Sequence, residues 1–347
     1  TPKTMINEAN NAMKSGYNRY SSPRGLEELR IKIKNELKKY NSINTSKENI
    51  IITPGAKNAI FISLMTLLKP RDEVIISSPH YVSYAPQIKM AEPKSIIRIV
   101  NLKKSDFSLN FDLIKKNVNN KTRAVLLNYP NNPTGKMISK EDIKKLIDII
   151  KNKERCYIIS DEIYDRLNFS GKTHNSFAKY EEIKDRVITI NGFSKAFSIT
   201  GWRIGYLVGN HEFVKTALKI QQHINTNTCT FIQEAIYKSY DECLKFIDKQ
   251  NNLLKKNADL LNDVLVENKN ITFNKPQGGL FSFLNIKKTC MSSEDFSCKL
   301  IKEKGVVLIP GIKFGKNWDD HVRITLSAKK EDFKEGIQII DKFVKKF

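Results

Sequence analysis

The chain has 347 residues, carries a formal net charge of +22 and is 40% hydrophobic. No apolar run approaches the roughly 20 residues of a membrane-spanning helix, so the sequence predicts no bilayer span. Its 48 lysines far outnumber its 11 arginines and are spread along the whole chain, which favours solvated helix faces over a nucleic-acid site.

The cysteines are scattered, and their number is odd. Cys156, Cys229, Cys243, Cys290 and Cys298 include no Cys-x-x-Cys pair, which argues against a disulfide framework or a zinc site. No signal-peptide pattern opens the sequence. These features predict a cytoplasmic protein without a bound metal.

From about residue 49, short apolar runs alternate with helical patterns. Helices are predicted over about 57–68 and 140–151, the second opening with a capping-box-like Ser139 and Asp142. The apolar runs predict seven strands, at 50–52, 74–76, 96–100, 124–127, 157–159, 187–190 and 205–208. Their near-continuous hydrophobicity is typical of strands covered on both faces. The alternation predicts an α/β fold in which helices sandwich a mostly parallel seven-stranded sheet.

The pattern changes after about residue 210. A long helical stretch runs from 211 towards 249 with a break near 225–228, and another helix follows to about 266. Short strands at 280–284, 306–309 and 322–326 precede a terminal helix from 331. We therefore predict a large domain over 17–238 and a smaller α+β domain built from 1–16 and 239–347.

Ligands of parallel sheets bind beyond the carboxyl ends of the strands, so the loops that follow the strands are candidate sites. Residues 55–57 follow a strand and open a helix, where backbone N–H groups can hold a phosphate. Asp161 ends a buried strand, although a carboxylate there is often a helix N-cap. The turn-rich loop 129–135 follows another strand. Arg323 lies in an apolar strand, where a long cation needs an anionic partner.

Lys195 differs from most lysines of the chain because it follows a strand and is flanked by small hydroxyl residues. Burial in a mostly apolar pocket would favour its neutral amine, which is a usable nucleophile. Ser194 and Arg203 on either side are suitable donors for a phosphate. A lysine that can form an imine beside a phosphate site suggests pyridoxal 5′-phosphate.

Taken together and in this order, these segments resemble the class I/II aminotransferases of fold type I, the aspartate aminotransferase family. The resemblance covers essentially the whole chain. Its most specific parts are Asn-Asn-Pro-Thr-Gly at 131–135, Ser-Asp-Glu-x-Tyr at 160–164 and Ser-Lys-x-Phe-x-x-x-Gly-Trp-Arg-x-Gly at 194–205.

The resemblance implies roles for residues that would act on the cofactor ring. Lys195 would hold pyridoxal 5′-phosphate through an imine and then act as the catalytic base. Asp161 would pair with the pyridine nitrogen and keep it protonated. Tyr164 and Asn132 would donate to the ring phenolate oxygen, and Tyr81 would stack on the ring.

The same resemblance implies the phosphate and partner contacts. Ser194, Arg203 and the backbone of Gly55, Ala56 and Lys57 would hold the phosphate. Tyr20 matches the tyrosine that reaches the phosphate of the neighbouring subunit, which implies a homodimer with shared active sites. His80 is interpreted as a loop histidine beside the cofactor rather than as a base.

For the substrate, the resemblance implies that Arg323 grips the α-carboxylate with a bidentate fork and that Asn132 also binds the substrate. Lys57 falls where the bacterial-type subgroup has a lysine for the distal carboxylate, although an ordinary surface lysine is an equal alternative. The leading hypothesis is an aminotransferase for aspartate- or glutamate-type amino acids with a 2-oxo acid as acceptor.

Other activities on the same scaffold stay open at this point. An aromatic or broad-specificity aminotransferase and a carbon–sulfur β-lyase would share the cofactor motifs. A cofactor-binding regulatory domain is disfavoured, because the full catalytic set is present. Family members usually begin with an arm ahead of a Thr-Pro pair, and the present sequence starts at Thr1-Pro2.

Overall fold

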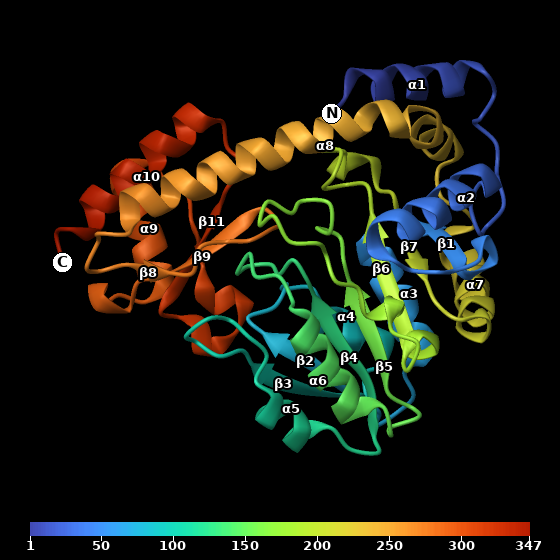
Figure 1. Cartoon of the computed structure of the whole chain (residues 1–347), viewed down its shortest axis with the longest axis horizontal. Helices are drawn as coiled ribbons and strands as arrows, with labels where there is room; N and C mark the ends of the chain where they lie inside the picture. The colour runs from blue at the N-terminus through green and yellow to red at the C-terminus, as the bar shows by residue number, and fades with distance from the viewer.

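A computed structural model describes all residues from 1 to 347. Its main sheet has seven strands in the order β1-β7-β6-β5-β4-β2-β3 (Figure 1). Their bounds are β1 (Ile50–Thr53), β2 (Glu73–Ser78), β3 (Ile96–Asn101), β4 (Thr122–Asn128), β5 (Tyr157–Asp161), β6 (Val187–Gly192) and β7 (Gly205–Val208). Only β7 runs antiparallel to its neighbours. The predicted fold class and all seven predicted strands are confirmed.

Helices cover both faces of this sheet because successive strand residues point to opposite sides. In β4, Ala124 and Leu126 pack with one set of helices, and Val125 and Leu127 pack with the other. The first set is α3 (Ala56–Leu67), α4 (Tyr84–Ala91) and α7 (His211–Asn225). The second set is α5 (Phe111–Asn117) and α6 (Lys140–Ile150). As predicted, α6 is capped by Ser139, which accepts a hydrogen bond from the Asp142 N–H.

The edge strand β3 departs from the prediction. Ile96 is 38% exposed and Ile99 is 54% exposed. Its hydrophobic run predicts burial on both faces, but β3 pairs only with β2 and lies at the end of the sheet. Position in the sheet, which the run alone does not encode, decides the exposure.

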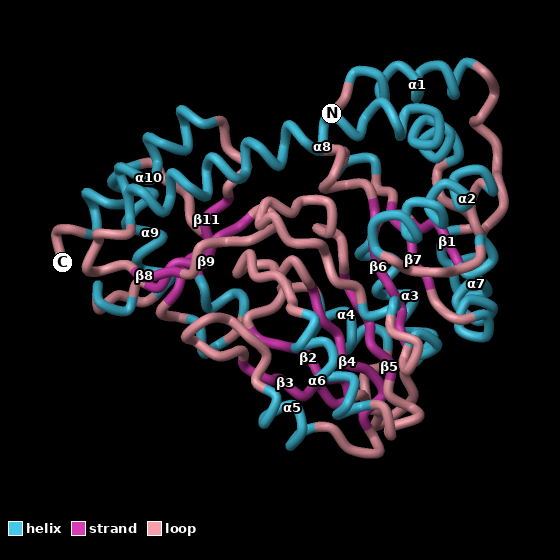
Figure 2. The backbone as a smooth tube through the Cα atoms, in the orientation of Figure 1, coloured by secondary structure: helices cyan, strands magenta, loops and turns pink.

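A second, antiparallel sheet has the order β10-β11-β9-β8 and lies apart from the first (Figure 2). Its strands are β8 (Thr272–Phe273), β9 (Phe281–Asn285), β10 (Ile309–Pro310) and β11 (His321–Thr325). It packs with α9 (Ser293–Lys304), α10 (Lys330–Val344) and the end of α8. β10 is shorter than the strand predicted over 306–309.

Helix α8 (Thr230–Leu265) is a single helix that joins both parts of the molecule (Figure 1). The sequence predicts two helices meeting near residue 249, but the chain stays helical there. Ile247 packs into the cluster beside the main sheet and Leu254 into the cluster beside the second sheet. Between them, the Asn251 amide donates to the Arg166 carbonyl oxygen at 2.9 Å.

The remaining helices lie at the other end of α8. Met5 of α1 (Lys3–Lys14) and Leu29 of α2 (Glu27–Glu36) share a hydrophobic cluster with Tyr240 of α8. The domain boundaries given above stay a prediction, because α8 crosses the boundary at 238 without a break. None of the helices is both long enough and apolar enough to cross a membrane.

Trp318 ties the second sheet to the first. It is fully buried, and its indole N–H donates to the Ser78 hydroxyl at the end of β2, at 3.1 Å. Its ring packs against Phe107 and Phe283 at centroid distances of 5.8 and 5.9 Å. The same cluster contains Ile75 of β2, so Trp318 bridges residues of both sheets.

We expect Trp318→Ala to reduce the free energy of unfolding by about 3–5 kcal/mol, because it leaves a cavity and removes the hydrogen bond to the Ser78 hydroxyl. Chemical denaturation of the purified protein measures the change. The control Ile99→Ala removes an exposed side chain and should cost less than about 1 kcal/mol. Equal effects of the two substitutions would contradict the assignment of Trp318 to the junction.

Candidate active site

The carboxyl ends of β1, β4, β5 and β6 meet at one edge of the main sheet because these strands are parallel to one another. A cavity of about 410 Å³ opens there. It is lined by Ala56, Lys57, Ile60, Tyr81, Tyr84, Asn128, Asn132, Asp161, Ile163, Tyr164, Ser194, Lys195, Thr200 and Arg203. Nine of the residues predicted from the sequence are therefore brought together around one space.

Asp161 ends β5 as a buried carboxylate without an ion-pair partner. It accepts hydrogen bonds from the Tyr84 hydroxyl at 2.7 Å and from the Ile163 N–H at 3.2 Å. Burial raises the pKa of Asp161 to about 6, although these hydrogen bonds and the Lys195 charge oppose the rise. The group is therefore mainly ionised at neutral pH, and it can stabilise a cation placed in the cavity.

Tyr84 is a site residue that the sequence analysis missed. It is 2% exposed, and burial followed by the charge of Asp161 raises its pKa, so the phenol stays protonated as a donor. It lies three residues after Tyr81 at the start of α4, and the two rings meet edge to face at a centroid distance of 5.6 Å. No sequence pattern marks Tyr84, because its contact with Asp161 forms only when the chain has folded.

Lys195 reaches the cavity from the loop after β6 and is partly buried. Burial lowers the pKa of Lys195, and the charges of Arg203 and Arg323 lower it further, while Tyr81 and Asp161 act in the opposite direction. The combined effect is a lowered pKa, so Lys195 loses its proton more readily than an exposed lysine. This is the condition for a lysine that must act as a nucleophile or a base.

The end of the cavity beside the first turn of α3 is built to receive an anion. The first N–H groups of a helix have no partner within the helix and carry a partial positive charge. Gly55 precedes them with φ of +87°, and a Cβ atom there would lie 2.5 Å from Arg203 Nη2. A Cβ atom on Gly205 would lie 2.6 Å from the Ala56 nitrogen. Both glycines thus permit a close approach of Arg203 and β7 to the helix start, where Ser194 adds a hydroxyl.

Arg323 comes from β11 of the second sheet and has no acidic partner. Its Nη1 donates to Asn132 Oδ1 at 3.0 Å, and its guanidinium carbon lies 4.0 Å from the centre of the Phe281 ring. Burial lowers the pKa of Arg323, and the nearby Tyr164 and Tyr81 partly offset this. A half-buried, unpaired guanidinium beside the cavity is suited to bind a carboxylate.

Lys57 lies near the Tyr81 ring, whereas the His80 ring is stacked with that of Tyr84 at a centroid distance of 6.4 Å. Lys57 Nζ lies 5.5 Å from the centre of the Tyr81 ring and has no acidic partner. Burial lowers the pKa of His80 to about 4, so its imidazole is neutral at neutral pH. A hydrogen bond joins its backbone N–H to the Phe314 carbonyl oxygen at 3.1 Å. These features agree with its interpretation as a loop residue rather than a base.

Tyr20 is the one predicted site residue that lies away from this cavity. Its side chain is 86% exposed. Its neighbours are fixed, because Thr230 Oγ1 donates to the Arg19 carbonyl oxygen at 2.8 Å and Asn227 Nδ2 to Ser21 Oγ at 3.2 Å. The residues on either side of Tyr20 are therefore held in place, while its own side chain faces solvent.

Residues 1–340 match the family model "Aminotransferase class I and II". The chain belongs to this family. The aspartate aminotransferase of Sulfurisphaera tokodaii is 38% identical, and the match covers 97% of this chain and 85% of that protein. The aromatic-amino-acid aminotransferase 2 of Thermococcus litoralis is 34% identical over 99% of this chain and 89% of the relative.

Solved structures agree with this family assignment. The aromatic aminotransferase of Pyrococcus horikoshii superposes with a TM-score of 0.95 at 32% identity, covering 100% of this chain and 93% of that one. The aspartate aminotransferase of Thermotoga maritima superposes with a TM-score of 0.91 at 32% identity. This match covers 99% of the present chain and 89% of the Thermotoga chain. The protein is thus an aminotransferase of fold type I, and the family depends on pyridoxal 5′-phosphate.

The residues of this aminotransferase fit that cofactor. The glycine-lined start of α3, with Ser194 and Arg203, matches a phosphate in charge and in available space. Asp161, also on the cavity wall, offers a buried anion for a protonated ring nitrogen. Lys195 supplies the amine, and Tyr81 supplies an aromatic face.

We expect Asp161→Asn to stabilise the cofactor-free aminotransferase in a pH-dependent way. The pKa of Asp161 is about 6 in the folded protein and about 4 in an unfolded chain, so the folded state holds this proton more tightly. The free energy of unfolding of the wild type therefore falls as the pH rises from about 4 to about 6, and the loss persists above pH 6.

Denaturation midpoints of the cofactor-free wild type and of Asp161→Asn, compared between about pH 4 and pH 7, test this expectation. The stability difference in favour of the variant should grow across this range. A difference that is independent of pH would contradict the assigned ionisation of Asp161.

Proposed function

We propose that this aminotransferase moves the amino group of an aspartate- or glutamate-type amino acid to a 2-oxo acid. The observation that carries the proposal is the pair of cations without acidic partners, Arg323 and Lys57, beside one cavity that also contains Lys195. A dicarboxylic amino acid supplies one anion for each cation. The curated relatives include aspartate aminotransferases at 30–38% identity, which supports this choice.

The reacting atoms require a base and a fixed charge. When bound, pyridoxal 5′-phosphate supplies a ring that withdraws electrons from the substrate Cα. We assign to Lys195 Nζ the transfer of the Cα proton, because the pKa of this amine is lowered by burial. We assign to Asp161 the stabilisation of the positive charge on the ring nitrogen. Asn132 and Tyr164 would donate to the ring oxygen, and burial raises the pKa of Tyr164 so that it remains a donor.

The substrate carboxylates would be held from opposite parts of the fold. Arg323 would bind the α-carboxylate, since it is oriented by Asn132 and by the Phe281 ring. Lys57 would bind the distal carboxylate from the start of α3. When both contacts form, they would hold the Cα–H bond of the substrate near Lys195, and the bound substrate would exclude water from the site.

A second candidate is an aromatic aminotransferase. The Tyr81 ring lies beneath Lys57 Nζ, so an aromatic side chain would also find an apolar surface there. The relatives named for aromatic amino acids, at 32–34% identity, support keeping this candidate.

Spectral titration of the cofactor-loaded protein with single amino acids distinguishes these candidates. Aspartate and glutamate should change the visible absorbance of the bound cofactor to that of its pyridoxamine form. They should do so at lower concentrations than phenylalanine or tyrosine. Lys57→Ala should weaken the binding of aspartate by roughly 10- to 100-fold, the value of a hydrogen bond to a charged group. The binding of free alanine, which has no distal carboxylate, should not change. Lys195→Ala should abolish conversion by every amino acid.

Other outcomes of this experiment would change the proposal. Conversion by aromatic amino acids first, with no effect of Lys57→Ala, would favour the aromatic candidate. Release of pyruvate and ammonia from cystathionine, without amino transfer, would indicate a carbon–sulfur β-lyase.

We also propose a homodimer in which Tyr20 reaches the cofactor phosphate of the partner subunit. Its 86% exposure and its fixed loop support this proposal. A cytoplasmic location is proposed as well, because all five cysteines are free. Detection of the protein in the cytoplasmic fraction of its source cells tests the location.

Tyr20→Phe should raise the dissociation constant of the cofactor by about tenfold, because one hydrogen bond to a charged group is lost. Equilibrium dialysis measures this constant, and light scattering should give twice the mass of a 39.9 kDa chain. A monomer with full cofactor affinity would refute both parts of the proposal.

A further inference from the structure

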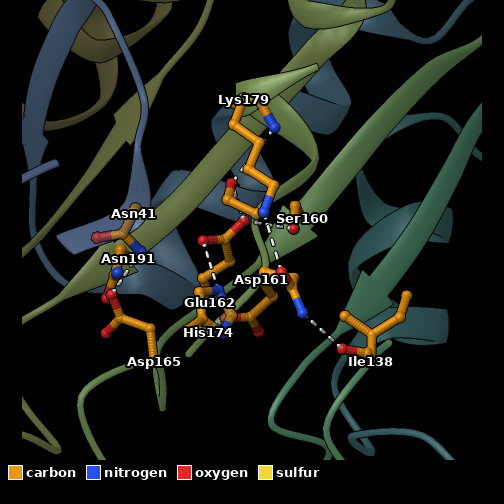
Figure 3. A network of polar contacts seen from close by, with 12 residues as sticks. Asn41, Ile138, Ser160, Asp161, Glu162, Asp165, His174, Lys179 and Asn191 are labelled. Carbon is orange, nitrogen blue, oxygen red and sulfur yellow. Dashed lines mark hydrogen bonds and ion pairs between the residues drawn. The ribbon is translucent and has the colours of Figure 1, made fainter. Parts of the chain in front are cut away.

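A second buried carboxylate, Glu162, follows Asp161 directly but does not line the active-site cavity. It is 1% exposed, and both of its oxygens are bonded (Figure 3). Oε1 accepts from the Ser160 hydroxyl at 2.8 Å and from the Ser176 hydroxyl at 2.7 Å. Oε2 lies 2.9 Å from His174 Nε2.

His174 balances the charge of this carboxylate. Its side chain is only 7% exposed. Burial lowers the pKa of His174, but the charge and the hydrogen bond of Glu162 outweigh this effect, so the pKa is raised overall. Asp165 raises it further and Lys179 lowers it. The two side chains lie within ion-pair distance, so a protonated His174 would neutralise the Glu162 carboxylate.

This compensation bears on Asp161, because like charges on adjacent buried residues oppose each other's ionisation. Burial makes the largest contribution to the raised pKa of Asp161, and the charge of Glu162 raises this pKa further. The other ionisable groups that face Asp161 are Tyr84, Tyr164 and Lys195, and Lys195 is the only cation among them. Tyr206 is a further ionisable neighbour of Glu162.

We propose that His174 is a positioning residue that keeps Asp161 ionised by neutralising the Glu162 carboxylate behind it. This inference rests on the proposed role of Asp161 opposite the ring nitrogen of the cofactor. Neither Glu162 nor His174 lines the cavity, so both would act through the charge of Asp161.

The proposal predicts unequal effects for the two partners. His174→Gln can keep a hydrogen bond to Glu162 but removes the positive charge, so an uncompensated carboxylate remains beside Asp161. Glu162→Gln removes the negative charge, and His174 then becomes neutral because it is buried. Asp161 should therefore be protonated more readily in His174→Gln and change little in Glu162→Gln.

The test compares the cofactor-loaded wild type with Glu162→Gln, His174→Gln and the double variant. For His174→Gln, we expect about a tenfold lower kcat at neutral pH with an unchanged KM, and a cofactor dissociation constant raised by a similar factor. The pH profile of cofactor binding should shift to higher pH, because a higher pH restores the ionised Asp161. In the double variant, kcat and the cofactor dissociation constant should lie within about threefold of the wild-type values, since no uncompensated charge remains.

A purely structural role of the pair would give a different pattern. Glu162→Gln would then lower kcat and cofactor affinity as much as His174→Gln. The double variant would be no more active than either single variant, and raising the pH would restore neither kcat nor cofactor affinity. That pattern, or an unshifted profile in His174→Gln, would overturn the proposal. Thermal unfolding of each cofactor-free variant reports on folding, and His223→Gln, at an exposed position of α7, controls for the loss of a histidine.

The wild type separates this inference from the proposed function. If the loaded wild type converts no amino acid, the proposed function is wrong. If it converts aspartate and the double variant is not rescued, only the role of His174 is wrong.

Discussion

The arrangement of the site depends on one buried charge, the carboxylate of Asp161. It lies at the end of a central strand, is 5% exposed, and has hydrogen-bond donors but no ion-pair partner. An ionised carboxylate in such a place is costly unless a cation meets it. The fold offers Lys195 across the same cavity, and the family's cofactor would add a protonated ring nitrogen. Tyr84 and the pair of Glu162 and His174 lie around Asp161 in positions that control its ionisation.

Two contacts between distant segments bring the other functional groups towards this charge. Gly205 of β7 lies against the first residues of α3, so the helix start and Arg203 border one anion-binding space. On the opposite side, β11 of the second sheet carries Arg323 to Asn132. The site therefore needs both sheets, and the junction around Trp318 and the continuous α8 hold them together.

Much of this could be predicted from the sequence. Apolar runs encode the strands of a covered parallel sheet, and the residues that follow those strands are brought together by the sheet itself. The sequence could not predict the exposure of Ile99 or the continuity of α8 near Asn251, because both depend on contacts between distant segments. Tyr84 and His174 were missed for the same reason: each meets its carboxylate only after the chain has folded.

We propose that one lysine, Lys195, holds the cofactor beside Asp161 and transfers the proton. Borohydride reduction of the cofactor-loaded protein, followed by mass mapping of its peptides, tests this most directly. We expect a pyridoxyl group on Lys195 alone among the 48 lysines. A modification at another lysine in place of Lys195, or no modification of a fully loaded protein, would contradict it.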